Sequence, residues 1–153
     1  MQISRQEHLA TFDGLPTAKK LSMLSEKRGL PEELHPFLNK LKQKRTLAIT
    51  AQRCRPTFNH QYALSKLKND GYKIAVCSNS IKNTIEAMML AADLQKYLDF
   101  CLSNEDVTAP KPDPEIYQMA MERLKLRPDE TLILEDNEHG IKAARSSGAH
   151  VME

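Results

Sequence analysis

The sequence has few of the features that mark membrane, secreted or nucleic-acid-binding proteins. Its longest apolar runs, such as 87–92, are far shorter than the roughly 20 residues that span a bilayer. The first residues, 1–5, lack the apolar segment of a secretory signal. The net charge of +2 is close to neutral, so neither nucleic acid nor an anionic membrane is expected as the main partner.

Cysteine is also scarce. The chain has three, Cys54, Cys77 and Cys101, without C-x-x-C spacing. An odd number without that spacing argues against a disulfide framework or a zinc site. A reducing compartment fits this usage best, and we expect the protein in the cytoplasm. The hydrophobic content of 41% is enough for a core, and 153 residues suit one domain with a small appendage.

Helical patterns fill the first third of the chain. Thr17 is a candidate N-cap, Gly29 is a plausible stop, and a second helical pattern begins near Pro36. The segment 40–55 is rich in lysine and arginine, which indicates either a solvated helix face or a patch that steers phosphate or nucleic acid. The composition changes near residue 55, so we divide the chain into a helical part, 1–55, and a second domain, 56–153.

Strand and helix patterns alternate in the second domain. Apolar runs at 72–77, 97–102, 131–134 and 148–152 predict strands, whereas 81–92, 114–124 and 141–145 have helical patterns. This alternation is typical of parallel βαβ units, and the predicted fold class is α/β, with a Rossmann-like, three-layer parallel sheet. Such a sheet places its ligand site outside the carboxyl ends of its strands.

Three polar motifs follow these predicted strands. They are Ser78-Asn79-Ser80, the proline-rich loop that carries Lys111, and the pair Glu135-Asp136. A hydroxyl, a lysine and two carboxylates at strand ends can together bind phosphate and Mg²⁺. His139, in contrast, has no second ligand at metal spacing, and we interpret it as surface.

Each motif has a plainer explanation as well. The Ser78 hydroxyl can hold phosphate oxygens, but serine also caps ordinary strand-to-helix turns. The prolines around Lys111 stiffen its loop, so its ammonium group can be held where it offsets phosphate charge. The plainer explanation is that Pro114 simply begins a helix after a turn. Glu135 and Asp136 are costly as neighbours unless a cation or hydrogen bonds compensate them, and Mg²⁺ commonly takes one or two carboxylates.

With these motifs the sequence resembles the haloacid dehalogenase superfamily, specifically its β-phosphoglucomutase-like phosphatase branch, over nearly the whole chain. The serine, lysine and acidic motifs match those of the family, and the segment 7–17 resembles the substrate-facing part of its helical cap. Residues 1–55 would therefore be a partial helical cap and 56–153 the α/β core. The resemblance implies Mg²⁺ as cofactor and these roles: Ser78 and Lys111 catalytic; Ser78, Asn79, Lys111 and Gly14 substrate-binding; Asp136 and Glu135 metal-binding.

The nucleophile of that family is missing from the sequence. The family's aspartate attacks phosphorus from a D-x-D-G-T strand that precedes the cap. Phe12-Asp13-Gly14 imitates this motif superficially, but Thr11 would occupy the nucleophile position and no apolar strand precedes it. We therefore expect a chain that is truncated at both ends and whose core lacks the nucleophile strand.

The resemblance implies a Mg²⁺-dependent hydrolase, a phosphatase or phosphomutase that acts on a small phosphorylated metabolite, with sugar phosphates as the leading class. Two alternatives remain open: a non-catalytic remnant that binds phosphate or a partner, and one half of a split enzyme. By itself the chain should lack turnover and bind metal weakly. The two strands that flank the missing one should pair directly, self-associate through their open edges or reduce solubility.

Overall fold

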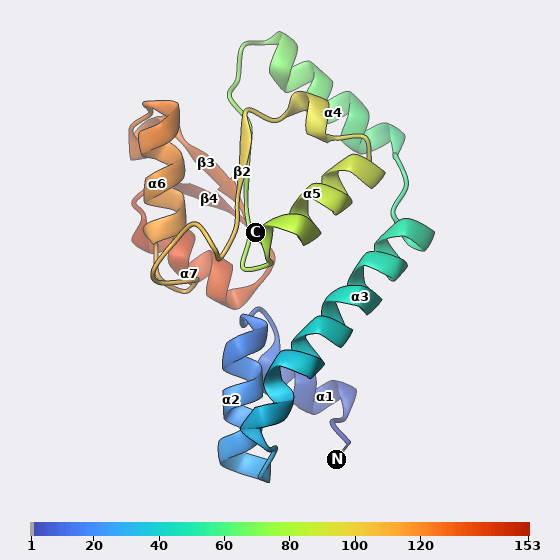
Figure 1. Cartoon of the computed structure of the whole chain (residues 1–153). Coiled ribbons are helices and arrows are strands. Elements are labelled where there is room, and N and C mark those ends of the chain that lie inside the picture. The colour runs from blue at the N-terminus through green and yellow to red at the C-terminus, as the bar shows by residue number, and fades with distance from the viewer. Residues whose placement is uncertain (1) are drawn as a thin grey trace.

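The computed structural model describes residues 2–153 and consists of a helical N-terminal part and an α/β part (Figure 1). Five elements form the helical part: α1 (Arg5–Glu7), the π-helical turn η1 (His8–Phe12), α2 (Thr17–Arg28), the 3₁₀ turn η2 (Glu32–Leu34) and α3 (His35–Arg53). None of the helices described in 2–153 has the length and apolar content needed to cross a bilayer.

Local sequence explains where the two long N-terminal helices begin and end. Helix α2 follows Pro16 and stops at Gly29, whose φ of +65° suits a residue without a side chain. Pro36 lies in the first turn of α3, where its missing N–H costs no helical hydrogen bond. Helix α3 then runs from the helical part towards the α/β part (Figure 1). Its residue Gln43 accepts a hydrogen bond from Thr84 at 3.1 Å.

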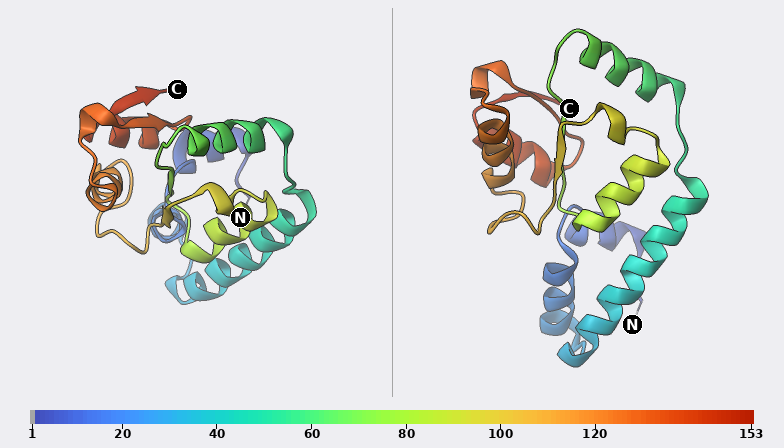
Figure 2. Two further views of the ribbon diagram at one scale, coloured as in Figure 1. Left: turned by 90° about the horizontal axis from the view of Figure 1, so that it is seen from above. Right: turned by 45° about the horizontal axis from the view of Figure 1, so that its top comes forward.

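The α/β part follows the predicted alternation of helices and strands. Its elements are α4 (Phe58–Asn69), β1 (Ala75–Cys77), α5 (Lys82–Ala91), η3 (Gln95–Tyr97), β2 (Phe100–Leu102), α6 (Glu115–Leu124), η4 (Pro128–Glu130), β3 (Leu132–Leu134), α7 (Glu138–Ser146) and β4 (His150–Met152). All strand pairs are parallel, which confirms the predicted α/β class. Figure 2 shows α4 and α5 on one side of the molecule and α7 with β4 on the other.

Within residues 2–153 the strands form two separate pairs, β1 with β2 and β3 with β4. Direct pairing of β1 with β3, one of the three outcomes expected, does not occur. On β3 the central residue Ile133 is buried, whereas Leu132 and Leu134 are 57% and 68% exposed. The inner edges of β1 and β3 therefore keep no strand partner in this part of the chain.

The main core lies between these two strand pairs and the helices α6 and α7. Its buried members are Leu102, Ile116, Tyr117, Ala120, Ile133, Ala143 and Ala144. Cys77 packs against this core, and burial raises the pKa of its thiol to about 12. A thiol in that state is protonated near neutral pH, so Cys77 behaves as a small apolar residue rather than as a nucleophile.

Candidate active site at the carboxyl ends of the strands

A cavity of about 520 Å³ lies between the helical part and the carboxyl ends of β1 and β3. Residues of both parts line it. The helical part contributes Gly14, Leu15, Thr17, Ala18, Lys20, Asn39, Lys42 and Gln43; the α/β part contributes Ser78, Asn79, Ser80, Asn104, Lys111, Glu135, Asn137 and His139, among others. Five of the six predicted site residues, all except Asp136, therefore face one cavity.

Lys111 is the most deeply buried charged group of this cavity, with 6% of its surface exposed. Its Nζ atom donates a hydrogen bond to the Cys77 carbonyl oxygen at 2.9 Å and another to Oε1 of Glu135. The lysine thus links the end of β1 to the residue that follows β3. Because an ammonium group has three N–H donors, these two acceptors leave one donor for a ligand.

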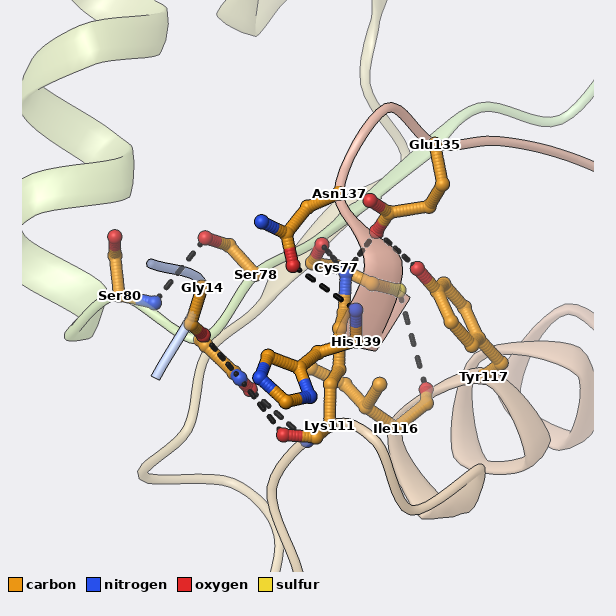
Figure 3. A network of polar contacts seen from close by, with 11 residues as sticks. Gly14, Cys77, Ser78, Ser80, Lys111, Ile116, Tyr117, Glu135, Asn137 and His139 are labelled. Atoms are coloured by element: carbon orange, nitrogen blue, oxygen red, sulfur yellow. Dashed lines mark hydrogen bonds and ion pairs between the residues drawn. The ribbon is translucent and has the colours of Figure 1, made fainter. Parts of the chain in front are cut away.

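Glu135 is held from two further directions. The phenol of Tyr117 donates a hydrogen bond to the same Oε1 atom, as Figure 3 shows. Burial and this carboxylate raise the pKa of Tyr117 well above its usual range, so the phenol remains a donor. Gly140 in the first turn of α7 leaves room for the carboxylate, since a Cβ atom there would collide with it. Close packing at Gly140 thus accommodates Glu135.

Ser78 and Asn79 form the turn after β1. The Ser78 Oγ atom accepts a hydrogen bond from the backbone N–H of Ser80 at 3.1 Å, which is the capping role of an ordinary turn. Among residues 2–153 its own O–H has no acceptor, so this donor can serve a ligand in the cavity. The amide of Asn79 is engaged by protein: it receives the N–H of Lys111 at 3.0 Å and donates to the carbonyl oxygens of Gly14 and Lys111. Asn79 therefore ties the loops of Lys111 and Gly14 to this turn.

A second contact ties the loop of Asp13 and Gly14 to Asn137, two positions after Glu135. Asn137 donates a hydrogen bond from Nδ2 to Asp13 at 3.0 Å and accepts the N–H of His139 at 3.0 Å, which caps α7. Gly14 has a φ of +71°, and a Cβ atom on it would collide with the Asn137 side chain. The segment 12–14 consequently fits closely between the turns that follow β1 and β3.

Asp136 points elsewhere. It lines an adjoining recess of about 240 Å³ together with Asp13, Glu138 and His139, whereas Glu135 faces the larger cavity. Adjacent residues in extended backbone project to opposite sides, which explains the separation. In residues 2–153, no three His, Cys, Asp or Glu side chains are placed to hold a metal ion together. Glu135 and Asp136 by themselves therefore do not fit a Mg²⁺ ion.

Several cavity residues were not predicted. His139, interpreted as surface, is half-buried and lines both hollows, because it lies in the first turn of α7 at the end of β3 (Figure 3). Lys20 and Lys42 face the cavity from the helical part. Burial, and next the Lys42 charge, lower the pKa of Lys20, while Asp13 opposes this shift. Helical periodicity alone does not reveal which lysines of the helical part face the α/β part.

Known proteins resemble the chain across most of its length. The profile described as "Haloacid dehalogenase-like hydrolase" matches residues 1–153. The phosphorylated carbohydrates phosphatase of Thermotoga maritima is 27% identical over 135 residues, or 88% of this chain and 62% of that protein. The (S)-2-haloacid dehalogenase 4A of Burkholderia cepacia is 31% identical over 138 residues, or 90% of this chain and 54% of that protein.

Solved structures show the same fold. The β-phosphoglucomutase of Clostridium difficile superposes with a TM-score of 0.81 at 21% identity, covering 99% of this chain and 69% of that one. At this identity the similarity establishes the fold alone. The chain spans 62% and 54% of the length of the two curated relatives above. From the match over residues 1–153, the parallel α/β fold and the motifs at its strand ends, we conclude that the chain belongs to the haloacid dehalogenase-like hydrolase family.

Proposed function

We propose that this chain supplies the phosphate-binding part of a Mg²⁺-dependent hydrolase that acts on a small phosphorylated metabolite through an aspartyl-phosphate. The observation that carries the proposal is the buried Lys111, held between Cys77 and Glu135 at the strand ends with one N–H donor to spare. Lys111 and Ser78 are the proposed catalytic residues because both can offer a donor to phosphate oxygens in the same cavity.

The charge of the cavity favours a phosphate ester. Its walls carry three lysines, Lys20, Lys42 and Lys111, against one carboxylate, Glu135. Lys111 is neutralised by Glu135, which leaves the two cap lysines without an ion-pair partner among residues 2–153. A phosphate monoester carries about two negative charges near neutral pH, whereas a 2-haloacid carries one. The electrostatics therefore support a phosphatase or phosphomutase over a dehalogenase, and sugar phosphates are the leading substrate class.

The proposed nucleophile comes from outside the described residues. Asp13 and Asp136 line the smaller recess and not the cavity of Lys111. We propose that an aspartate-bearing extended segment pairs with the inner edges of β1 and β3, as the family resemblance implies. Glu135 and Asp136 are proposed Mg²⁺ ligands only together with carboxylates of that segment, since the two do not share a hollow in this structure.

Reconstitution tests this proposal. The chain is assayed with Mg²⁺ on p-nitrophenyl phosphate, a sugar-phosphate panel and 2-chloropropionate, alone and mixed with a polypeptide that carries an Asp-x-Asp-Gly-Thr strand. We expect turnover of phosphate esters only in the mixture, and its loss when the first aspartate of the added strand is replaced by asparagine. Turnover by the chain alone that disappears with Asp13→Ala would instead restore Phe12-Asp13-Gly14 as the nucleophile motif.

The same mixture separates the two alternatives. One half of a split enzyme gains turnover when the second polypeptide is added. A non-catalytic remnant binds inorganic phosphate but stays inactive in every mixture. Sizing of the chain at several concentrations reports on the proposed self-association through the open edges of β1 and β3, which the added strand should suppress.

A further inference from the structure

Tyr117 lies in the first turn of α6 and is only 5% exposed. Its ring lies beside the ammonium group of Lys111, with Nζ 4.7 Å from the ring centroid. Figure 3 shows its phenol directed at the carboxylate of Glu135. One buried aromatic side chain thus contacts both members of the Lys111–Glu135 pair.

The carboxylate of Glu135 is confined on three sides. The ammonium of Lys111 and the phenol of Tyr117 both donate to Oε1. The backbone of α7 at Gly140 lies so close to the carboxylate that no Cβ atom would fit between them. These neighbours therefore restrict the orientation of the Glu135 carboxylate.

We propose that Tyr117 is a positioning residue that holds Glu135 so that the ammonium of Lys111 keeps one N–H donor available to an anion in the cavity. A lysine ammonium is a compact charge whose donors rotate freely, so it does not orient a carboxylate by itself. The terminal torsion of a glutamate is broad. Without the phenol, Glu135 can turn and accept a second N–H from Lys111, which removes the donor that a phosphate oxygen would use.

The inference rests on the proposed function for the identity of the anion, but its first test requires no ligand. The ¹⁵N-ammonium signal of Lys111, assigned by its loss in Lys111→Arg, reports hydrogen exchange of the N–H donors with water. We expect exchange to become roughly 10- to 100-fold slower in Tyr117→Phe, because the third N–H is then bonded to the charged Glu135 carboxylate. Glu135→Gln should instead accelerate the exchange, because Lys111 loses its charged acceptor.

Tyr97→Phe is the matched control. The Tyr97 phenol donates a hydrogen bond to Gln61 at 2.8 Å, and neither residue lines the cavity. Both phenylalanine variants lose one partly buried phenol hydrogen bond, so a general loss of stability would appear in the melting temperatures of both. Of these two variants, only Tyr117→Phe should change the exchange of the Lys111 ammonium. Unchanged or faster exchange in Tyr117→Phe would overturn the inference.

Calorimetry with inorganic phosphate links this residue to ligand binding. We expect the dissociation constant to rise about 10-fold in Tyr117→Phe and to stay unchanged in Tyr97→Phe. Equal phosphate affinity in the wild type and Tyr117→Phe would overturn the positioning role. Slower Lys111 exchange in Tyr117→Phe, with no phosphate binding by any form, would support the positioning role and refute the proposed function.

Discussion

The side chains of Lys111 and Glu135 form an ion pair across the space between the ends of β1 and β3, and they are only 7% and 13% exposed. These two strands are not paired with one another. The pair, supported by Tyr117, therefore connects the two halves of the strand layer through side chains instead of backbone hydrogen bonds. A buried charge without its partner is expensive, so each member depends on the other.

Lys111→Met should lower the free energy of unfolding by about 3–5 kcal/mol, because it leaves the Glu135 carboxylate buried without a counter-charge. Urea unfolding followed by circular dichroism measures this change. The double variant Lys111→Met/Glu135→Leu should be less destabilised than Lys111→Met, since no unpaired charge remains. Additive losses from the two substitutions would show that the pair is not coupled.

Gly14→Ala should destabilise the protein more than Gly29→Ala. Both glycines have a positive φ, +71° and +65°, so alanine strains both backbones to a similar degree. Only at position 14 would the new Cβ atom also collide with Asn137, whereas nothing lies within 4 Å at position 29. The midpoints of thermal unfolding for the two variants give the comparison.

Asn137→Ala distinguishes a collision from backbone strain at Gly14. In the Asn137→Ala background, Gly14→Ala should lower the midpoint of thermal unfolding by no more than Gly29→Ala does, because the side chain that collides is absent. The hydrogen bond from Asn137 to Asp13 is lost in that background, so cleavage of the chain near Asp13 by a protease should be faster. If Gly14→Ala costs as much stability in the Asn137→Ala background as in the wild type, backbone strain alone explains its effect.

Lys20→Gln and Lys42→Gln should each weaken binding of inorganic phosphate by about 2- to 5-fold, an effect that salt reduces. Lys19→Gln is the control, because Lys19 is exposed and does not line the cavity. Calorimetric titrations at low and high salt provide the constants. If Lys19→Gln weakens binding as much as the other two, the effect reflects net charge and not the cavity.

Acid unfolding should depend on Asp106. Its carboxylate accepts hydrogen bonds from the Ser103 hydroxyl at 2.6 Å and the Ser103 N–H at 2.8 Å, and these hold its pKa below the ordinary value of 3.8. A lowered pKa contributes stability that is full above the ordinary value and is lost as the pH falls through the lowered one. Asp106→Asn should therefore reduce stability near neutral pH and flatten its decline from about pH 5 to pH 2. Parallel pH profiles of the two proteins would exclude this role.

The elements of the α/β part could be predicted because each has a local signal. The apolar residues of β3 and the proline before α6 are visible over a few neighbouring positions, and the observed strands and helices lie within a few residues of their predicted bounds. The motifs at the strand ends were visible for the same reason. Parallel strands share one direction, so a polar residue after one strand is close to a polar residue after the next.

The α/β class and the residues at each strand end can be predicted from the sequence, because they depend on local pattern and on the uniform direction of parallel strands. How those side chains divide follows from tertiary packing: Glu135 joins Lys111 in the cavity, while Asp136 faces the recess. Tertiary packing also places Lys20 and His139 at these hollows and keeps β1 and β3 apart. Such features depend on how distant segments pack in three dimensions, which no local pattern contains.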